Sequence, residues 1–330
     1  MKVLAVDDDS FILELLGMIA GRAGFTDIST ALSGEIALDI LNDDDVIFDC
    51  LLLDINMPGI DGIELCALVR AMPAYRKTPI IMLTARAEKD YIDRAFKAGA
   101  TDYANKPFDI VELGARLRMA QEVVVARQEA AAAISTLDAH RPKVANQHAF
   151  DLSDEVQIEG TKHLIEYAAL GNYLTQLSRA GLVGSQVLAI KIDRIEAIYA
   201  RGSSEEFLYA LTEVADAVGD ALRSNGYMMA YAGSGVFVVI SSKATLEPSA
   251  ELEAKVQDLL DEKNSEYDNG EPLDIEVSIG NPLRPNTSKT QRIRKTFDRA
   301  IARAENRVLK KRSEPRLVNI RLVGGLEKSY

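Results

Sequence analysis

The sequence is poor in the residues that build disulfide-stapled or metal-clustered proteins, with two cysteines and three histidines among 330 residues. Cys50 and Cys66 lie in apolar or helical stretches and are too few for a disulfide framework, so we expect buried thiols. His140 and His148 have no companions at metal-ligand spacing. The N-terminal stretch does not read as a signal peptide, and no apolar run reaches membrane length. We therefore expect a cytoplasmic protein.

Basic residues are also fewer than acidic ones, 38 against 50, and the net charge is −12. This balance argues against a general nucleic-acid-binding surface. The helical stretch 292–312 is rich in Arg and Lys, and it could contact nucleic acid or the acidic face of a partner. Interleaved acids such as Asp298 and Glu305 favour a solvated helix face instead. No helix-turn-helix pattern follows the first domain, which disfavours a transcription factor.

The first third of the chain alternates strand-like and helix-like segments. The expected strands are 2–6, 27–30, 49–54, 79–83 and 102–105. The expected helices are 10–22, 34–42, 62–72, 88–98 and one that starts at 109. Five such units predict an α/β fold, with a doubly wound, five-stranded parallel sheet and helices on both faces.

The helical pattern after residue 109 runs on, and we interpret 123–136 as a helical connector followed by a linker at 138–155. Beyond it, strands and helices mix in an order that predicts an α+β domain with a mostly antiparallel sheet. The expected strands are 187–192, the two arms of a hairpin at 228–240, 273–280 and 316–323. The expected helices are 204–224, 249–262 and 293–312. We divide the chain into domains at 1–122 and 156–330, joined by a connector and linker at 123–155.

Polar side chains gather where the strands of the first domain end. Asp7 and Asp8 follow the first strand, and Asp54 ends the third. Thr84 ends the fourth strand and Lys106 follows the fifth. The carboxyl ends of parallel strands meet at one edge of the sheet. Clustered carboxylates repel one another unless a cation such as Mg²⁺ lies between them, and a nearby lysine suits a phosphoryl group. The set predicts phosphoryl transfer onto a carboxylate.

The stretches "VDDD", "LLLDINMPGIDG", "LTA" and "KPF" resemble the receiver domain of two-component response regulators over residues 1 to about 122. By this resemblance, Asp54 is the phospho-acceptor, and Asp7, Asp8, Asp54 and the backbone carbonyl of Asn56 hold Mg²⁺. Thr84 and Lys106 bind the phosphoryl group. Tyr103 matches the aromatic residue whose rotamer reports activation. A sensor histidine kinase or a phosphotransfer protein is the implied phosphodonor.

Residues 160–325 resemble a GGDEF (diguanylate cyclase) domain in the order of their elements. Phe237 and Ser278-Ile279-Gly280 fit the family pattern, but the working residues depart from it. The hairpin turn reads Gly233, Ser234, Gly235, with Val236 where a metal-binding glutamate is expected. Lys191 stands at a metal-binding aspartate, and Asp193 keeps the second acid of that motif. Tyr199 and Leu208 fall at the guanine-reading positions, and Arg223 alone remains of the inhibitory motif.

These departures predict a degenerate domain that is not an enzyme and acts by homodimerisation or by binding another protein. One alternative is a nucleotide sensor for GTP or cyclic di-GMP, in which Lys191 and the glycine turn bind a phosphate without metal. Another alternative is an active cyclase with displaced acids. Of the two interpretations of the hairpin we favour a structural one, in which Gly233 and Gly235 are turn residues.

Overall fold

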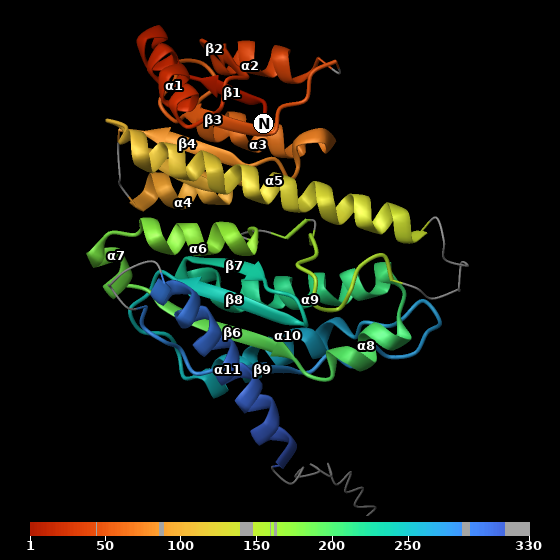
Figure 1. The fold of residues 1–330 in the computed structure, drawn as a ribbon. Coiled ribbons are helices and arrows are strands. Elements are labelled where there is room, and N and C mark those ends of the chain that lie inside the picture. The colour runs from red at the N-terminus through yellow and green to blue at the C-terminus, as the bar shows by residue number, and fades with distance from the viewer. Residues whose placement is uncertain are drawn as a thin grey trace, which may run out of the picture.

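The computed structural model describes residues 1–43, 45–85, 89–138, 148–158, 160–161, 164–285 and 291–313. Two sheets stand one above the other in Figure 1, each flanked by its own helices. None of the described helices is long and apolar enough to cross a membrane. The expected strand at 316–323 lies outside the described residues, as does His140.

The first domain contains a parallel five-stranded sheet in the order β2-β1-β3-β4-β5, as predicted. Its strands are β1 (Val3–Val6), β2 (Ile28–Ala31), β3 (Cys50–Asp54), β4 (Ile80–Thr84) and β5 (Asp102–Asn105). Its helices are α1 (Ser10–Arg22), α2 (Gly34–Leu41), α3 (Gly62–Ala71), α4 (Lys89–Lys97) and α5 (Ile110–Asp138). The central strands are buried on both faces, which accounts for their continuous apolar sequences.

Alternate residues of each strand enter two different apolar cores. Val3, Cys50 and Leu52 face α1 and α5, whereas Leu4 and Leu51 belong to the core on the side of α2, α3 and α4. This separation follows from the two-residue period of a strand. Both cysteine thiols are buried, and burial raises the pKa of Cys50 to about 12 and that of Cys66 to about 11.

The second domain contains an antiparallel sheet in the order β7-β8-β6-β9. Its strands are β6 (Gln186–Ile192), β7 (Tyr227–Tyr231), β8 (Val236–Ser241) and β9 (Val277–Ile279). Its helices are α6 (Tyr167–Gln176), α7 (Arg179–Val183), α8 (Ile195–Arg201), α9 (Ser204–Leu222), α10 (Ser249–Lys263) and α11 (Gln291–Ser313). Helices α6 and α11 pack on one face of this sheet, and α9 and α10 pack on the other.

The structure corrects the sequence-based description of this region at three helices and one strand. Helices α6, α7 and α8 were not expected, and the strand expected at 273–280 is shorter in the structure, where it is β9.

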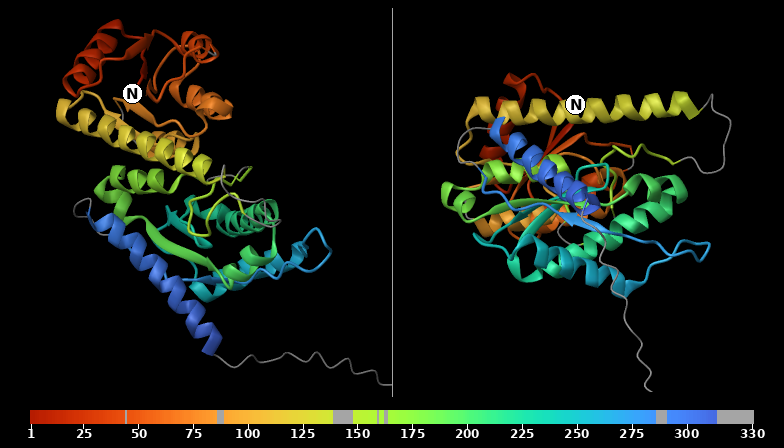
Figure 2. Two further views of the ribbon diagram at one scale, coloured as in Figure 1. Left: turned by 45° about the vertical axis from the view of Figure 1, so that its right-hand side comes forward. Right: turned by 90° about the horizontal axis from the view of Figure 1, so that it is seen from below.

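Helix α5 continues without a break through the expected connector, so no change of structure marks residue 122. It spans the width of the molecule between the two domains (Figures 1 and 2). Arg127 on this helix pairs with Glu166 at 3.0 Å, just before α6.

Candidate functional site

The acidic residues of the first domain meet at the carboxyl edge of the parallel sheet. Asp7 follows β1, Asp54 ends β3 and Thr84 ends β4, and their exposed fractions are only 1%, 3% and 1%. One oxygen from each of Asp7, Asp8 and Asp54 lies within 4.8 Å of the others. The sequence therefore placed these residues together correctly. Asp8 remains exposed, so the cluster opens to solvent on one side.

Lys106 lies between the two buried carboxylates. Its Nζ is 2.6 Å from Asp7 Oδ2 and 2.6 Å from Asp54 Oδ1. Burial disfavours the ammonium, but hydrogen bonds to Asp54 and Asp7 outweigh that effect and raise the pKa of Lys106. Burial also raises the pKa of Asp7, against the opposing influence of Lys106. The lysine thus neutralises part of a charge that would otherwise destabilise the fold.

Backbone amides orient the same carboxylates. The amide of Asp9 donates to Asp7 Oδ1 at 3.1 Å, and the amide of Asn56 donates to Asp54 Oδ2 at 2.8 Å. Asn56 is exposed beside the cluster. Three carboxylates at this spacing form the hard oxygen donor set that Mg²⁺ prefers, together with waters and a main-chain carbonyl. The residues present therefore fit a magnesium ion.

Tyr103 lies on β5, three residues before Lys106, and is 3% exposed. Its ring belongs to the apolar core that also contains residues of α4 and α6. The expected switch residue therefore lies at the boundary between the domains.

Comparison with known proteins agrees with this geometry. Residues 3–118 match the family model described as response regulator receiver domain. Over 108 residues, the chain is 40% identical to chemotaxis protein CheY of Pseudomonas aeruginosa, covering 33% of this chain and 86% of that protein. The chain belongs to the response regulator family.

Other relatives of this response regulator match through the same domain. It is 42% identical over 119 residues to transcriptional regulatory protein CpxR of Escherichia coli, covering 36% of this chain and 47% of that protein. It thus spans about half the length of this relative. A solved structure of a putative response regulator from Chloroflexus aurantiacus is 39% identical, with a TM-score of 0.34, and covers 36% of this chain and 95% of that one. The match to the family model ends at residue 118, before the second domain.

The glycine turn of the second domain is covered by a segment of the response regulator itself. The amide of Ser234 donates to the carbonyl of Leu152 at 2.7 Å. A Cβ on Gly233 would lie 2.2 Å from the carbonyl oxygen of Ser153. The amide of Gly235 donates to the hydroxyl of Tyr231 at 2.9 Å. The amides of Ser234 and Gly235, which could donate to a phosphate, are thus already bound within the chain.

The same segment fills an aromatic slot next to the turn, formed by the rings of Tyr199 and Phe207. The ring of His148 stacks on Tyr199 with centroids 3.7 Å apart, and its Nε2 donates to the Tyr199 carbonyl at 2.5 Å. The Tyr199 hydroxyl donates to the carbonyl of Phe150 at 2.5 Å, and Phe207 meets the Tyr199 ring edge-on. Sequence analysis missed this cluster. The signal was the recurrence of large side chains at every second residue, His148, Phe150 and Leu152, within the expected linker.

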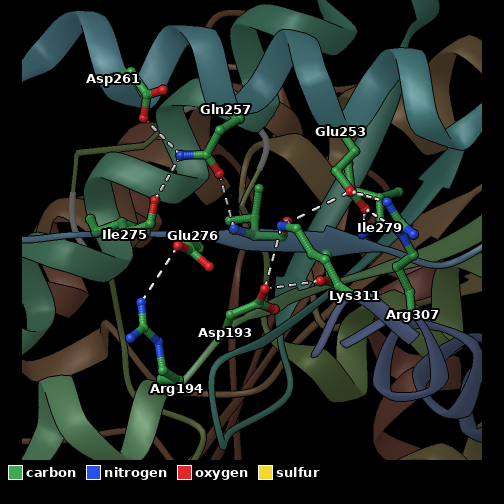
Figure 3. A network of polar contacts seen from close by, with 12 residues as sticks. Asp193, Arg194, Glu253, Gln257, Asp261, Ile275, Glu276, Ile279, Arg307 and Lys311 are labelled. Carbon is green, nitrogen blue, oxygen red and sulfur yellow. Dashed lines mark hydrogen bonds and ion pairs between the residues drawn. The ribbon is translucent and has the colours of Figure 1, made fainter. Parts of the chain in front are cut away.

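Two lysines occupy the region where the family resemblance placed metal-binding acids. Lys191 Nζ donates to the carbonyl of Ser234, and burial lowers the pKa of Lys191. Asp193, which is 6% exposed, accepts from Ser278 Oγ at 3.1 Å and from Lys311 Nζ at 3.4 Å. Figure 3 shows Lys311 reaching from α11 toward Asp193. Asp193 therefore serves to fix α11 and β9 against β6.

Basic residues of α11 also point into their own domain. Arg307 forms two hydrogen bonds with Glu253, at 2.8 and 3.1 Å, and Glu253 Oε2 accepts from the amide of Ile279 (Figure 3). Arg303 donates to the carbonyls of Asn281 and Pro282. The interpretation of this helix as a solvated face was therefore wrong for Arg303, Arg307 and Lys311.

We predict that Gly233→Ala destabilises the second domain more than the matched change Gly270→Ala. Both glycines have a positive φ, +83° and +78°, which costs an alanine about 1 kcal/mol. Nothing lies within 4 Å of a Cβ at Gly270, whereas at Gly233 the Ser153 carbonyl must move, which adds about 1–3 kcal/mol. Urea unfolding of the two variants would measure the difference. Equal losses would show that the segment does not pack tightly on the turn.

Proposed function

We propose that this response regulator is a phosphorylation-dependent signalling protein of a two-component system in which Asp54 accepts the phosphoryl group. The observation that carries this proposal is the position of the buried Asp54 carboxylate, 2.6 Å from Lys106 and within 4.8 Å of oxygens of Asp7 and Asp8. The phosphodonor is a sensor histidine kinase or a phosphotransfer protein. The receiver matches support this partner class and place of action in the cytoplasm.

Each residue of the pocket has a role in the proposed transfer. Mg²⁺, when bound to Asp7, Asp8, Asp54 and the carbonyl of Asn56, neutralises charge on the transferred group. The Asp54 carboxylate attacks phosphorus, and the bond to the donor nitrogen breaks. The ammonium of Lys106 then binds a phosphoryl oxygen, and Thr84 hydrogen-bonds another. We assign the switch role to Thr84 and Tyr103, because one ends β4 and the other lies at the domain boundary.

We further propose that the second domain is a degenerate, catalytically inactive GGDEF-like domain. We place it at 156–330, with the receiver at 1–122 and a connector and linker at 123–155. Cyclisation of a nucleoside triphosphate requires two metal ions near the attacking oxygen. Lys191 brings a cation to that region, and Val236 is buried and offers no oxygen. This domain would act by homodimerisation or by docking on another protein.

A nucleotide sensor is less well supported. Residues 148–154 occupy both the glycine turn and the aromatic slot beside Tyr199, so a nucleotide would have to displace them. The displaced backbone would lose the hydrogen bonds that satisfy its carbonyls. We therefore favour a structural turn over a binding one.

We expect a small phosphodonor with Mg²⁺ to label the wild-type chain and Asp27→Asn, but not Asp54→Asn. Asp27 is an exposed acid of the same domain and controls for general effects of charge. Removal of Mg²⁺ by a chelator should also abolish labelling, because the clustered carboxylates would no longer be neutralised. Phosphoprotein gels or intact mass would give the readout. Persistent labelling of Asp54→Asn would overturn the assignment.

We expect beryllofluoride, a mimic of the phosphoryl group, to convert the chain from monomer to dimer in the presence of Mg²⁺. Light scattering would measure the molar mass, with Asp54→Asn as the control. A mass that does not change would contradict homodimerisation and would leave a different protein as the partner of the second domain.

We expect no binding of GTP or cyclic di-GMP in calorimetry and no cyclic dinucleotide product after incubation with GTP and Mg²⁺ or Mn²⁺. The physical reason is that residues 148–154 already bond to the glycine turn, while Lys191 and Lys311 are hydrogen-bonded to Ser234 and Asp193 within the domain. Stoichiometric binding would support the nucleotide-sensor alternative, and formation of a cyclic dinucleotide would support the active-cyclase alternative.

A further inference from the structure

A cavity of about 510 Å³ lies between the two domains, away from the acidic cluster of the receiver. Its receiver wall is formed where α3 and α4 lead into β4 and β5, and its second-domain wall by residues 155–158 and 164–169. Strands β4 and β5 begin beside this cavity, whereas Asp54 and Thr84 end their strands at the opposite edge of the sheet. Pockets that bind small molecules typically have volumes of roughly 300–1,000 Å³. The cavity is therefore large enough for such a ligand.

Contacts between the domains hold the two walls of the cavity in place. Helix α6, which follows the second-domain wall, lies between the two sheets (Figure 1). The rings of Tyr173 on α6 and Phe96 on α4 meet edge-on with centroids 5.5 Å apart. The Tyr173 hydroxyl donates to Asp93 Oδ1 at 2.8 Å, and Asn172 Nδ2 donates to the carbonyl of Thr101 at 2.9 Å. The cavity is thus preformed rather than assembled by a ligand.

The cavity is basic, although the net charge of the whole chain is −12. Two of the described residues that line it are acidic, Glu155 and Glu166, and five are basic, Arg70, Arg76, Lys77, Lys97 and Arg127. Lys77 and Lys97 are exposed and form no ion pair within the described part of the chain. A concave surface with an excess of one charge attracts ligands of the opposite charge. The cavity therefore favours an anion.

Arg70 adds a charge that no carboxylate of the described residues binds directly. Its guanidinium donates four hydrogen bonds, to three main-chain carbonyls and to the hydroxyl of Thr101, at 2.7 to 3.3 Å. All these acceptors are neutral, and burial lowers the pKa of Arg70. Glu166, the acid nearby, is paired with Arg127 at 3.0 Å. Buried charges are normally compensated by a charge of the opposite sign, which an anion in the cavity would supply.

The second-domain wall has a different character from the receiver wall. Ile158, Leu164 and Ile165 give it an apolar surface, and Ile158 is buried. Glu155 and Glu166 lie on the same side, so a second anionic group that reached across the cavity would meet like charge. A ligand with one anionic group and a neutral, apolar body satisfies both walls.

We propose that this interdomain cavity binds a small organic phosphate. Its single phosphate group would contact Arg76, Lys77 and Lys97, and its apolar body would lie against Ile158 and Leu164. A phosphate monoester carries more than one negative charge near neutral pH and several acceptor oxygens, so it can bond to more of these cations at once than a carboxylate can. The site is separate from Asp54 and does not depend on phosphoryl transfer.

Calorimetry of the full chain with phenyl phosphate tests the proposal, in the presence of a chelator so that no Mg²⁺ occupies the acidic cluster. We expect saturable binding with one site per chain. Lys77→Gln and Lys97→Gln should each weaken binding about tenfold, because each removes a charge-assisted hydrogen bond to the phosphate. Lys243→Gln, at an exposed lysine outside the cavity, should leave Kd unchanged, as should Asp54→Asn.

Two further probes separate the parts of the ligand. Phenol, which lacks the anion, should not bind, and inorganic phosphate, which lacks the apolar body, should bind more weakly than phenyl phosphate. The proposal is overturned if phenyl phosphate does not bind, or if Lys77→Gln and Lys97→Gln leave its Kd unchanged. Equal affinity for inorganic phosphate would contradict an organic ligand. Loss of binding in Asp54→Asn would assign the phosphate to the acidic cluster instead.

Discussion

Repulsion between the clustered carboxylates at the carboxyl edge of the parallel sheet constrains where Lys106 and β5 lie. Asp7 and Asp54 are buried beside the exposed Asp8, and like charges at this spacing destabilise one another unless cations compensate. Lys106 supplies one such cation from the end of β5. Its place in the chain makes the position of β5 sensitive to charge at Asp54. A phosphoryl group on Asp54 would therefore act on the residue that directly follows β5.

The second domain uses lysines in a different way. Lys106 leaves an open side at its cluster, where Mg²⁺ fits beside Asp8. Lys191 and Lys311 instead bond to Ser234 and Asp193 and complete the packing of β6, the hairpin turn and α11. Asp193 Oδ1 has no hydrogen-bond partner among the described residues, and burial raises the pKa of Asp193. In this part of the second domain the cations beside the buried polar groups are thus side chains of the protein itself.

The sequence predicted the receiver well because its signals are local. Strand and helix periods alternate in order, and residues such as Asp54 and Thr84 end strands whose direction the fold dictates. Helix α6 and the segment that precedes the second domain were harder to predict from the sequence. Helix α6 contains Gly171 and Asn172, which weaken a helical signal, and its burial depends on a receiver face that is distant in sequence. Residues 148–155 looked like part of a linker, because the expected linker at 138–155 has no sustained period, yet aromatic contacts hold His148 and Phe150 in place.

The contact between the domains combines two kinds of interaction that respond differently to displacement. Apolar packing between Tyr173 and Phe96 is non-directional and weakens gradually as surfaces slide. The bonds of Asp93, Thr101 and Arg116 to α6 are directional, and they weaken steeply when their geometry changes. A movement of β5 or α4 too small to expose the core would still break these bonds. The buried groups left unpaired would then disfavour the docked helix. The register between the two domains therefore depends on these few polar contacts more than on the apolar packing beside them.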